Sequence, residues 1–152
     1  MREIQAEKIT TLVERLCIEA CYVLADDIDR KFHSCLQTER SPLGRQVLTT
    51  LIDNARIARE ERVPICQDTG MTVIFVTWGQ DVRITGGFIE DAINQGVRQG
   101  YEKGYLRKYV VRDPIDRVNT KDNTPAIIHY EMVPGDAFHI VVAPKGFGSE
   151  NK

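Results

Sequence analysis

The apolar residues in the first third of the chain recur at steps of three and four, which is the period of an amphipathic helix. This spacing predicts a helix from residue 3 to about 35. Ser41 and Pro42 indicate the start of a second helix, because serine is a favoured N-cap and proline fits the first turn. The buried stripe expected of this second helix is Leu43, Val47, Leu48, Leu51, Ile52, Ala55 and Ala58.

The pattern changes in the middle of the chain. A near-continuous apolar run over residues 71–79 predicts a strand that is covered on both faces. Residues 80–85 are predicted to be its short hairpin partner. Helical spacing returns over residues 88–103, and Gly96 and Gly100, four apart on that helix, predict close packing against a neighbour.

The last third of the chain is a polar loop followed by two strands. Residues 107–123 contain few apolar positions, and a loop of this length is usually functional or mobile. Strands at 126–132 and 137–143 are joined by Val-Pro-Gly-Asp, which is typical of a hairpin. The whole pattern predicts one α+β domain over residues 1–152, with N-terminal helices packed on a small mixed or antiparallel sheet.

Composition narrows the classes of function. The chain has 152 residues, 42% hydrophobic, with a net charge of −2, which gives no reason to expect binding to nucleic acid or to an anionic membrane. No apolar run approaches the roughly 20 residues of a membrane span. Four cysteines show neither metal-finger spacing nor disulfide density, so a reducing cytoplasm is the expected location. The stop at Lys152, just after a glycine-rich turn, indicates a chain truncated at its C-terminus.

The richest chemistry lies in Pro-Ile-Cys-Gln-Asp-Thr-Gly around Cys66, a turn between a helix and a strand. A thiolate there can bind iron or act as a nucleophile, whereas the residue type alone favours a small buried apolar role. Cys17 and Cys21 are interpreted as core residues. His129 and His139 are interpreted as ordinary core or surface residues of the two last strands.

Four motifs together resemble one enzyme family. They are Pro-Ile-Cys-Gln-Asp-Thr-Gly at 64–70, Gly-Tyr-Leu-Arg at 104–107, Asn-Thr-Lys-Asp-Asn-Thr-Pro at 119–125 and Pro-Lys-Gly-Phe-Gly-Ser-Glu-Asn at 144–151. In order and spacing they are similar to the N-terminal part of the alpha subunit of class I fumarate hydratases and L-tartrate dehydratases. The resemblance implies the same fold class, helices on a small mixed sheet.

The resemblance also implies a metal cofactor. In that family three cysteines hold a 4Fe–4S cluster, whose open iron acts as a Lewis acid on the leaving hydroxyl. Cys66 matches the first of these cysteines, and the other two belong to sequence beyond Lys152. Cys17, Cys21 and Cys35 precede the motif and do not match. The chain alone is therefore expected to hold no complete cluster and to be inactive.

The resemblance assigns substrate-binding roles to Gln67, Asp68 and Arg107. Gln67 and Asp68 match residues that contact the bound dicarboxylate, and Asp68 is the candidate catalytic residue, donating a proton to the leaving hydroxyl or orienting it. Arg107 matches an arginine that binds a substrate carboxylate. Without the resemblance, Asp68 would be interpreted as a turn residue bonded to the backbone of Gly70, and Arg107 as a solvated loop residue.

A glycine-rich turn completes the expected pocket. Lys145, Gly146 and Gly148 match a substrate-binding turn that can present N–H groups to an anion, and Phe147 stands where some relatives have glycine. The residues expected to shape the same pocket are Asn119, Thr120 and Asn123.

The function these residues imply is reversible hydration of fumarate to malate, a step of the tricarboxylic acid cycle. Dehydration of L-tartrate to oxaloacetate is the alternative within the same chemistry, and a non-catalytic assembly domain is the alternative from another class. An enzyme with Cys66 as nucleophile ranks last, because no histidine lies near it in sequence. The expected partners are a beta subunit, a dicarboxylate substrate and further copies of the chain.

Overall fold

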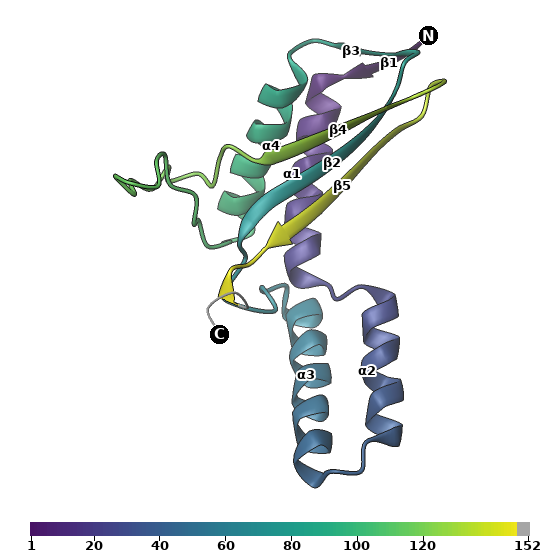
Figure 1. The fold of residues 1–152 in the computed structure, drawn as a ribbon, viewed down its shortest axis with the longest axis vertical. Coiled ribbons are helices and arrows are strands. Elements are labelled where there is room, and N and C mark those ends of the chain that lie inside the picture. The colour runs from purple at the N-terminus through teal and green to yellow at the C-terminus, as the bar shows by residue number, and fades with distance from the viewer. Residues whose placement is uncertain (149–152) are drawn as a thin grey trace. The chain divides into compact units, whose positions relative to one another are not determined.

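The computed structural model describes residues 1–148 of the chain (Figure 1). Residue contacts divide it into two compact units, which are residues 1–20 with Gln67 onward, and Cys21–Cys66. The prediction of one domain over residues 1–152 stays a prediction. No helix in the described part has the length and apolarity needed to cross a membrane. The elements in chain order are β1 (Arg2–Gln5), α1 (Ala6–Tyr22), α2 (Asp26–Thr38), α3 (Pro42–Glu61), β2 (Met71–Gly79), β3 (Val82–Thr85), α4 (Ile89–Lys103), β4 (Ile127–Val133) and β5 (Phe138–Lys145).

The central sheet has three strands in the order β4-β2-β5. β2 is parallel to β4, with Val73 opposite Ile127, and antiparallel to β5, with Met71 opposite Lys145. The predicted α+β class with a mixed sheet is confirmed. The predicted hairpin of the last two strands is wrong as a pairing, because β2 lies between them. β2 is the strand of this sheet with the most buried positions, as its central place requires, whereas β4 and β5 have none that are fully buried.

Helices α1 and α4 cover one face of this sheet (Figure 1). The inward residues Thr72, Ile74 and Val76 of β2 are no more than 1% exposed. A Cβ added to Gly96 would lie 2.6 Å from the Thr10 carbonyl oxygen of α1, so the predicted close packing of the α4 glycines is confirmed. Thr10 Oγ1 also donates to the Ala92 carbonyl at 2.9 Å, joining the two helices.

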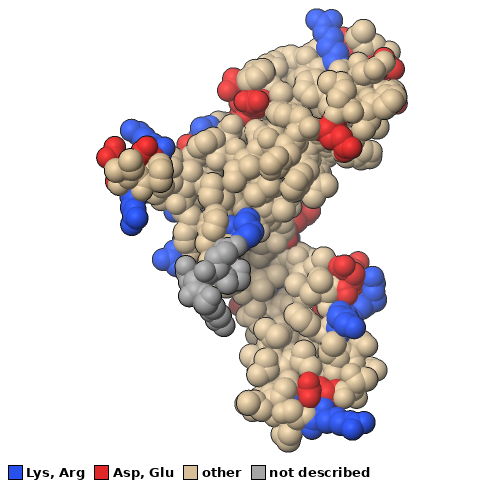
Figure 2. Space-filling model, viewed as in Figure 1, with Lys and Arg blue, Asp and Glu red and all other residues tan. Residues whose placement is uncertain are grey.

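The other face of the sheet is open, which contradicts the prediction that β2 is covered on both faces. Phe75 is 48% exposed and Val141 is 58% exposed, and the ring of Phe75 stacks on that of His129 with centroids 5.1 Å apart. Figure 2 shows few charged side chains over the strands in this view. A continuous apolar run thus does not separate a fully buried strand from one with an uncovered apolar face.

The N-terminus corrects two further predictions. Residues 2–5 are a strand rather than helix, and they pair in parallel with β3 in a separate two-stranded sheet. β3 is therefore not a hairpin partner of β2. Four residues paired across about 80 positions leave no local pattern in the sequence, because only the distant partner satisfies their backbone groups.

The unit Cys21–Cys66 is a helical hairpin of α2 and α3. The predicted helix 3–35 is interrupted at Ala25, whose extended backbone (ψ 141°) caps α2. Three aspartates in the first turn of α2, at 26, 27 and 29, favour a helix start there through the helix dipole. The start of α3 is as predicted, since Ser41 Oγ accepts from the Gly44 N–H at 3.3 Å.

The buried stripe predicted for α3 is largely wrong. Of its seven members only Ala55 and Ala58 are buried in the described structure, whereas Leu43 is 70% exposed and Val47 is 49% exposed. The helix has the expected periodicity, but within this unit only α2 is available to cover it.

Candidate functional site

The turn that precedes β2 is held against the end of β5. Gly70 has φ +61°, and a Cβ there would lie 2.1 Å from the carbonyl oxygen of Lys145. Only glycine fits this close approach with a left-handed backbone. The geometry brings the motif at 67–70 beside the glycine-rich turn, although about 75 residues separate them in sequence.

The carboxylate of Asp68 accepts hydrogen bonds from that glycine-rich turn. Its Oδ2 accepts from the N–H of Phe147 at 3.0 Å and from the N–H of Gly148 at 3.1 Å. A Cβ on Gly146 would lie 2.8 Å from the same oxygen. In this structure the turn thus donates two N–H groups to the carboxylate of Asp68, and its predicted role in binding substrate stays a prediction. Ser149, the last residue of the predicted turn, lies outside the described residues.

Arg107 is fixed to the same turn through its backbone. The hydroxyl of Thr69, which is 4% exposed, donates to the Arg107 carbonyl and accepts from the Arg107 N–H, both at 2.9 Å. The hydroxyl of Tyr101 on α4 donates to the carbonyls of Thr69 (2.8 Å) and Gly70 (3.2 Å). Four polar backbone groups are satisfied in this way, so the position of Arg107 relative to the turn is set by buried contacts.

Asn123 is a second buried connection. Its side chain is fully buried, and its Nδ2 donates to the Gly70 carbonyl at 3.1 Å. Its Oδ1 accepts from the N–H groups of Tyr109 at 2.7 Å and Val110 at 3.2 Å. Asn123 therefore ties the loop after Arg107 to the start of β2, from a backbone with φ +61°.

Asn119 and Thr120 hold the same loop from the other side. Asn119 Nδ2 donates to the Lys108 carbonyl at 2.9 Å, and Thr120 Oγ1 donates to the Val110 carbonyl at 3.2 Å. Both side chains are half-buried. Of the three residues expected to shape a pocket, all bond loop or turn backbone.

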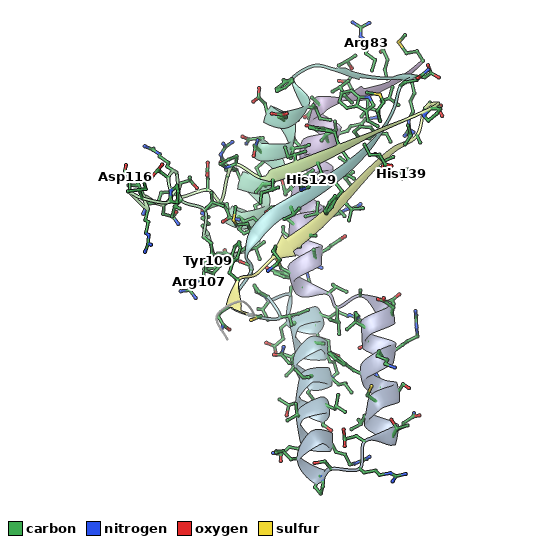
Figure 3. All side chains as sticks on the ribbon, viewed as in Figure 1. Arg83, Arg107, Tyr109, Asp116, His129 and His139 are labelled. Atoms are coloured by element: carbon green, nitrogen blue, oxygen red, sulfur yellow. The ribbon has the colours of Figure 1, made fainter. Side chains whose placement is uncertain are left out.

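Two residues of this arrangement were not predicted from the sequence, Thr69 and Tyr109. The Tyr109 hydroxyl donates to the Gln67 carbonyl at 2.9 Å, and the Arg107 Cζ lies 5.3 Å from the centroid of its ring. Figure 3 shows Arg107 and Tyr109 close together near the start of β2. Thr69 lies inside the 64–70 motif, and its type would have indicated backbone bonding. Tyr109 left no signal in the sequence.

Lys145 turns toward its own loop. Its Nζ donates to the Gly146 carbonyl and lies 5.1 Å from the centroid of the Phe147 ring. The candidate groups in this unit are thus an exposed amide (Gln67), a half-buried carboxylate (Asp68), an exposed guanidinium (Arg107) and the N–H pair of the turn.

The cysteines differ in accessibility. Cys66 is exposed, which contradicts the buried role that its residue type favoured, and it immediately precedes Gln67 in the chain. Cys17 and Cys21 are buried, as predicted, and burial raises the pKa of the Cys21 thiol to about 11. Within residues 1–148, no three His, Cys, Asp or Glu side chains are grouped to hold a metal. Cys66 is thus the one cysteine of the chain whose side chain is exposed, since Cys35 is half-buried, and an exposed thiol is a residue type that can bind iron.

A separate cavity of about 740 Å³ is lined mainly by apolar side chains, including Trp78, Val82, Phe88 and Tyr130. None of the predicted site residues that the structure describes lines it. The candidate site at the start of β2 is therefore distinct from this cavity.

Comparison with known proteins agrees with the motifs. The family model described as fumarate hydratase (Fumerase) matches residues 10–152. A Methanocaldococcus jannaschii protein with the provisional name L(+)-tartrate dehydratase subunit alpha is 33% identical over 150 residues, covering 95% of this chain and 52% of that protein. The anaerobic class I fumarate hydratase of Escherichia coli K12 is 31% identical over 153 residues, covering 99% of this chain and 28% of that protein.

The L(+)-tartrate dehydratase subunit alpha of Escherichia coli UTI89 is 30% identical over 145 residues, covering 93% of this chain and 47% of that protein. The chain thus spans about half the length of the two alpha subunits that it matches. The resemblance inferred from the four motifs is confirmed, and the chain belongs to the fumarate hydratase (Fumerase) family.

Proposed function

We propose that this chain supplies part of the active site of a hydro-lyase that adds water reversibly to fumarate to give malate. The observation that carries the proposal is the convergence of Gln67, Asp68, Arg107 and the 146–148 turn within one unit, through Gly70 and the buried side chains of Thr69 and Asn123. These groups offer hydrogen-bond donors and positive charge to an anion, and one carboxylate to a proton.

Arg107 is the group proposed to bind one substrate carboxylate. Its guanidinium is exposed, and no carboxylate of residues 1–148 forms an ion pair with it. A guanidinium pairs with a carboxylate through two parallel N–H···O bonds, which fixes orientation as well as charge. The exposed Gln67 amide lies on the neighbouring turn and is proposed to donate to a second substrate oxygen.

Asp68 is the proposed catalytic residue. In the hydration direction its carboxylate takes a proton of the attacking water as the new C–O bond forms and the C=C π electrons move to the neighbouring carbon, which then takes a proton from a partner acid outside this chain. In dehydration the partner group removes that carbon-bound proton, the C=C bond re-forms, and Asp68 gives its proton to the leaving hydroxyl. The two N–H donors of the 147–148 peptide groups stabilise the ionised carboxylate between these steps. The same donors, with Gly146, are proposed to bind a substrate oxygen, and Lys145 supports that turn.

The cofactor implied by the family is a 4Fe–4S cluster, which supplies a Lewis acid for the hydroxyl when it is bound. Cys66 is proposed as one of its three cysteine ligands. The remaining ligands, the catalytic partner groups and further carboxylate-binding residues are proposed to come from other sequence, including a beta subunit. The active assembly is proposed to be cytoplasmic, to contain several copies of the chain and to belong to the tricarboxylic acid cycle.

The test is turnover by the chain combined with its beta subunit after anaerobic cluster reconstitution, with fumarate and L-tartrate as competing substrates. We expect the higher kcat/KM with fumarate, and Asp68→Asn is expected to lower kcat by about 10²-fold or more. A higher kcat/KM with L-tartrate would contradict fumarate as the substrate and support L-tartrate dehydration instead. The names of the two matching alpha subunits favour that alternative.

The lone chain provides the matched control for this assay. Because Cys66 is its one exposed cysteine, and Cys35 does not match a ligand of the family, we expect reconstitution of the chain by itself to give neither a stable cluster nor turnover. Absence of turnover by an iron-loaded complex with its beta subunit would contradict the proposed function and leave a non-catalytic assembly role.

A further inference from the structure

Tyr109 contacts two of the proposed substrate-binding residues, Arg107 and Gln67. Its ring lies beneath the Arg107 guanidinium, with Cζ 5.3 Å from the ring centroid, and its hydroxyl donates to the Gln67 carbonyl at 2.9 Å. A cation within about 6 Å of a ring centroid is attracted by the ring face. One half-buried side chain therefore contacts the residue proposed to bind a carboxylate and the residue proposed to bind a second substrate oxygen.

The ring of Tyr109 is itself anchored to the buried part of the fold. The Tyr109 N–H donates to Asn123 Oδ1 at 2.7 Å, and Asn123 Nδ2 donates to the Gly70 carbonyl. Asn123 is 0% exposed, so the side chain that accepts from the Tyr109 N–H lies inside the fold. The position of Tyr109 is consequently set by the same buried connection that fixes the turn before β2.

Arg107 needs such a support because its backbone and its side chain are held differently. Thr69 fixes the backbone on both sides of the residue, whereas the guanidinium is exposed at the end of a long flexible side chain. Ordering such a side chain costs conformational entropy on binding, and a surface that orders it beforehand reduces that cost.

We propose that Tyr109 is a positioning residue that orients the Arg107 guanidinium through its ring and holds the Gln67 backbone through its hydroxyl. This inference rests on the proposed function, because it assigns the support of the same dicarboxylate site. It predicts that the ring and the hydroxyl contribute separately, and that phenylalanine keeps the first contribution while losing the second.

The binding experiment titrates L-malate into the purified chain by calorimetry, comparing wild type with Tyr109→Phe, Tyr109→Leu and Arg107→Lys. Tyr109→Leu is expected to weaken binding about threefold to fivefold and Tyr109→Phe about twofold or less. Tyr105→Leu is the matched control, since Tyr105 is in the same loop, is 90% exposed and is expected to leave binding unchanged. In the complete enzyme, Tyr109→Leu is expected to raise KM more than it lowers kcat.

A second measurement tests the contact without ligand. The Arg107 Nε–H proton resonance, assigned through its disappearance in Arg107→Lys, is expected to lie upfield because of the Tyr109 ring. It should stay there in Tyr109→Phe and move downfield in Tyr109→Leu. An Nε–H resonance that is unchanged in Tyr109→Leu would overturn the inference even if L-malate does not bind.

The two measurements separate the inference from the proposed function. Loss of binding in Arg107→Lys with wild-type binding in Tyr109→Leu would overturn the role of Tyr109 and leave the proposed function standing. Wild-type binding in Arg107→Lys would overturn the proposed role of Arg107. If the wild-type chain by itself binds no L-malate, the resonance still decides whether Tyr109 positions the guanidinium.

Discussion

The two sides of the candidate site are built differently. On the Arg107 side, the buried side chains of Thr69 and Asn123 bond the backbone of Gly70 and of residues 107–110. Tyr101 adds a third buried side chain, which bonds the Thr69 carbonyl. On the side of the glycine-rich turn, the N–H groups of Phe147 and Gly148, both exposed, donate to Asp68. The first side is part of the core of the fold, whereas the second depends on one carboxylate near the surface.

Because of this difference, we expect one side of the site to determine the stability of the fold and the other to determine the reaction. Groups that bond buried backbone cannot be removed without leaving polar atoms unsatisfied, so their loss should lower the free energy of unfolding. The two bonds that Asp68 Oδ2 accepts come from exposed residues, so they can be exchanged for bonds to water or substrate at lower cost. We therefore expect the Arg107 side to control the free energy of unfolding and the Asp68 side to control turnover.

The largest effect on stability is expected for Asn123→Ala. It would remove the side-chain partner of the N–H groups of Tyr109 and Val110 and of the Gly70 carbonyl. It would also place alanine at a position with φ +61°, where the left-handed backbone disfavours it. The expected loss is about 3 kcal/mol or more in the free energy of unfolding, measured by urea denaturation. Asn119→Ala, at a half-buried position, is the control and should cost less than half as much.

A smaller loss is expected for Thr69→Val, which keeps the shape of the side chain and removes its hydroxyl. The carbonyl and the N–H of Arg107 both lose their partner, so the free energy of unfolding should fall by about 1–2 kcal/mol. Thr69→Ser keeps the hydroxyl and should remain within about 0.5 kcal/mol of wild type. Equal losses in the two variants would show that packing of the methyl group, rather than the hydroxyl, holds this side.

On the other side of the site, Asp68→Ala should change the free energy of unfolding by less than about 1 kcal/mol. Its effect should appear instead in amide hydrogen exchange, where Phe147 and Gly148 should lose protection. Exchange at Tyr109 and Val110, which bond to Asn123, serves as the internal control and should not change. Global loss of protection in this variant would contradict the separation of the two sides.

The smallest effect is a pH dependence at Asp122. Burial alone raises the pKa of this carboxyl, but hydrogen bonds from Arg98, Thr124 and Thr120 outweigh burial and lower the pKa from 3.8 to about 2. The ionised form therefore contributes stability above about pH 4 that is lost as the pH falls through about 2. Asp122→Asn should lower the midpoint of thermal unfolding slightly at pH 7, with the difference vanishing toward pH 2. Asp116→Asn, at the loop tip in Figure 3, is the control and should leave the midpoint of thermal unfolding at pH 7 unchanged.

Features with a local or motif signal could be predicted from the sequence. The N-cap at Ser41, the helix over 89–103 and the strand that begins at Met71 follow from local patterns and were found. The 64–70 and 144–151 motifs identified the two turns that Gly70 brings together. The mutual contact of Asp68 with the turn N–H groups could not be predicted, because it depends on the register of β2 with β5.

The wrong predictions concern strands that pair with distant partners and apolar faces that no other element covers. The strand over residues 2–5 has no recognisable pattern in the sequence, because it is stabilised by pairing with the distant β3. The turn between β4 and β5 predicted that these two strands pair with each other, whereas β2 lies between them. The exposed Leu43 and Phe75 have the periodicity of buried residues, since periodicity reports which residues share a face and not what covers that face.

The most direct test of the candidate site is a titration of L-malate into the ¹⁵N-labelled chain, following each backbone amide. We predict that the amides of Gln67, Arg107, Phe147 and Gly148 shift together along one saturation curve, and that Arg107→Ala removes all four responses. Shifts confined to the apolar cavity around Trp78, or a response of the glycine-rich turn that is independent of Arg107, would contradict a single dicarboxylate site at the start of β2.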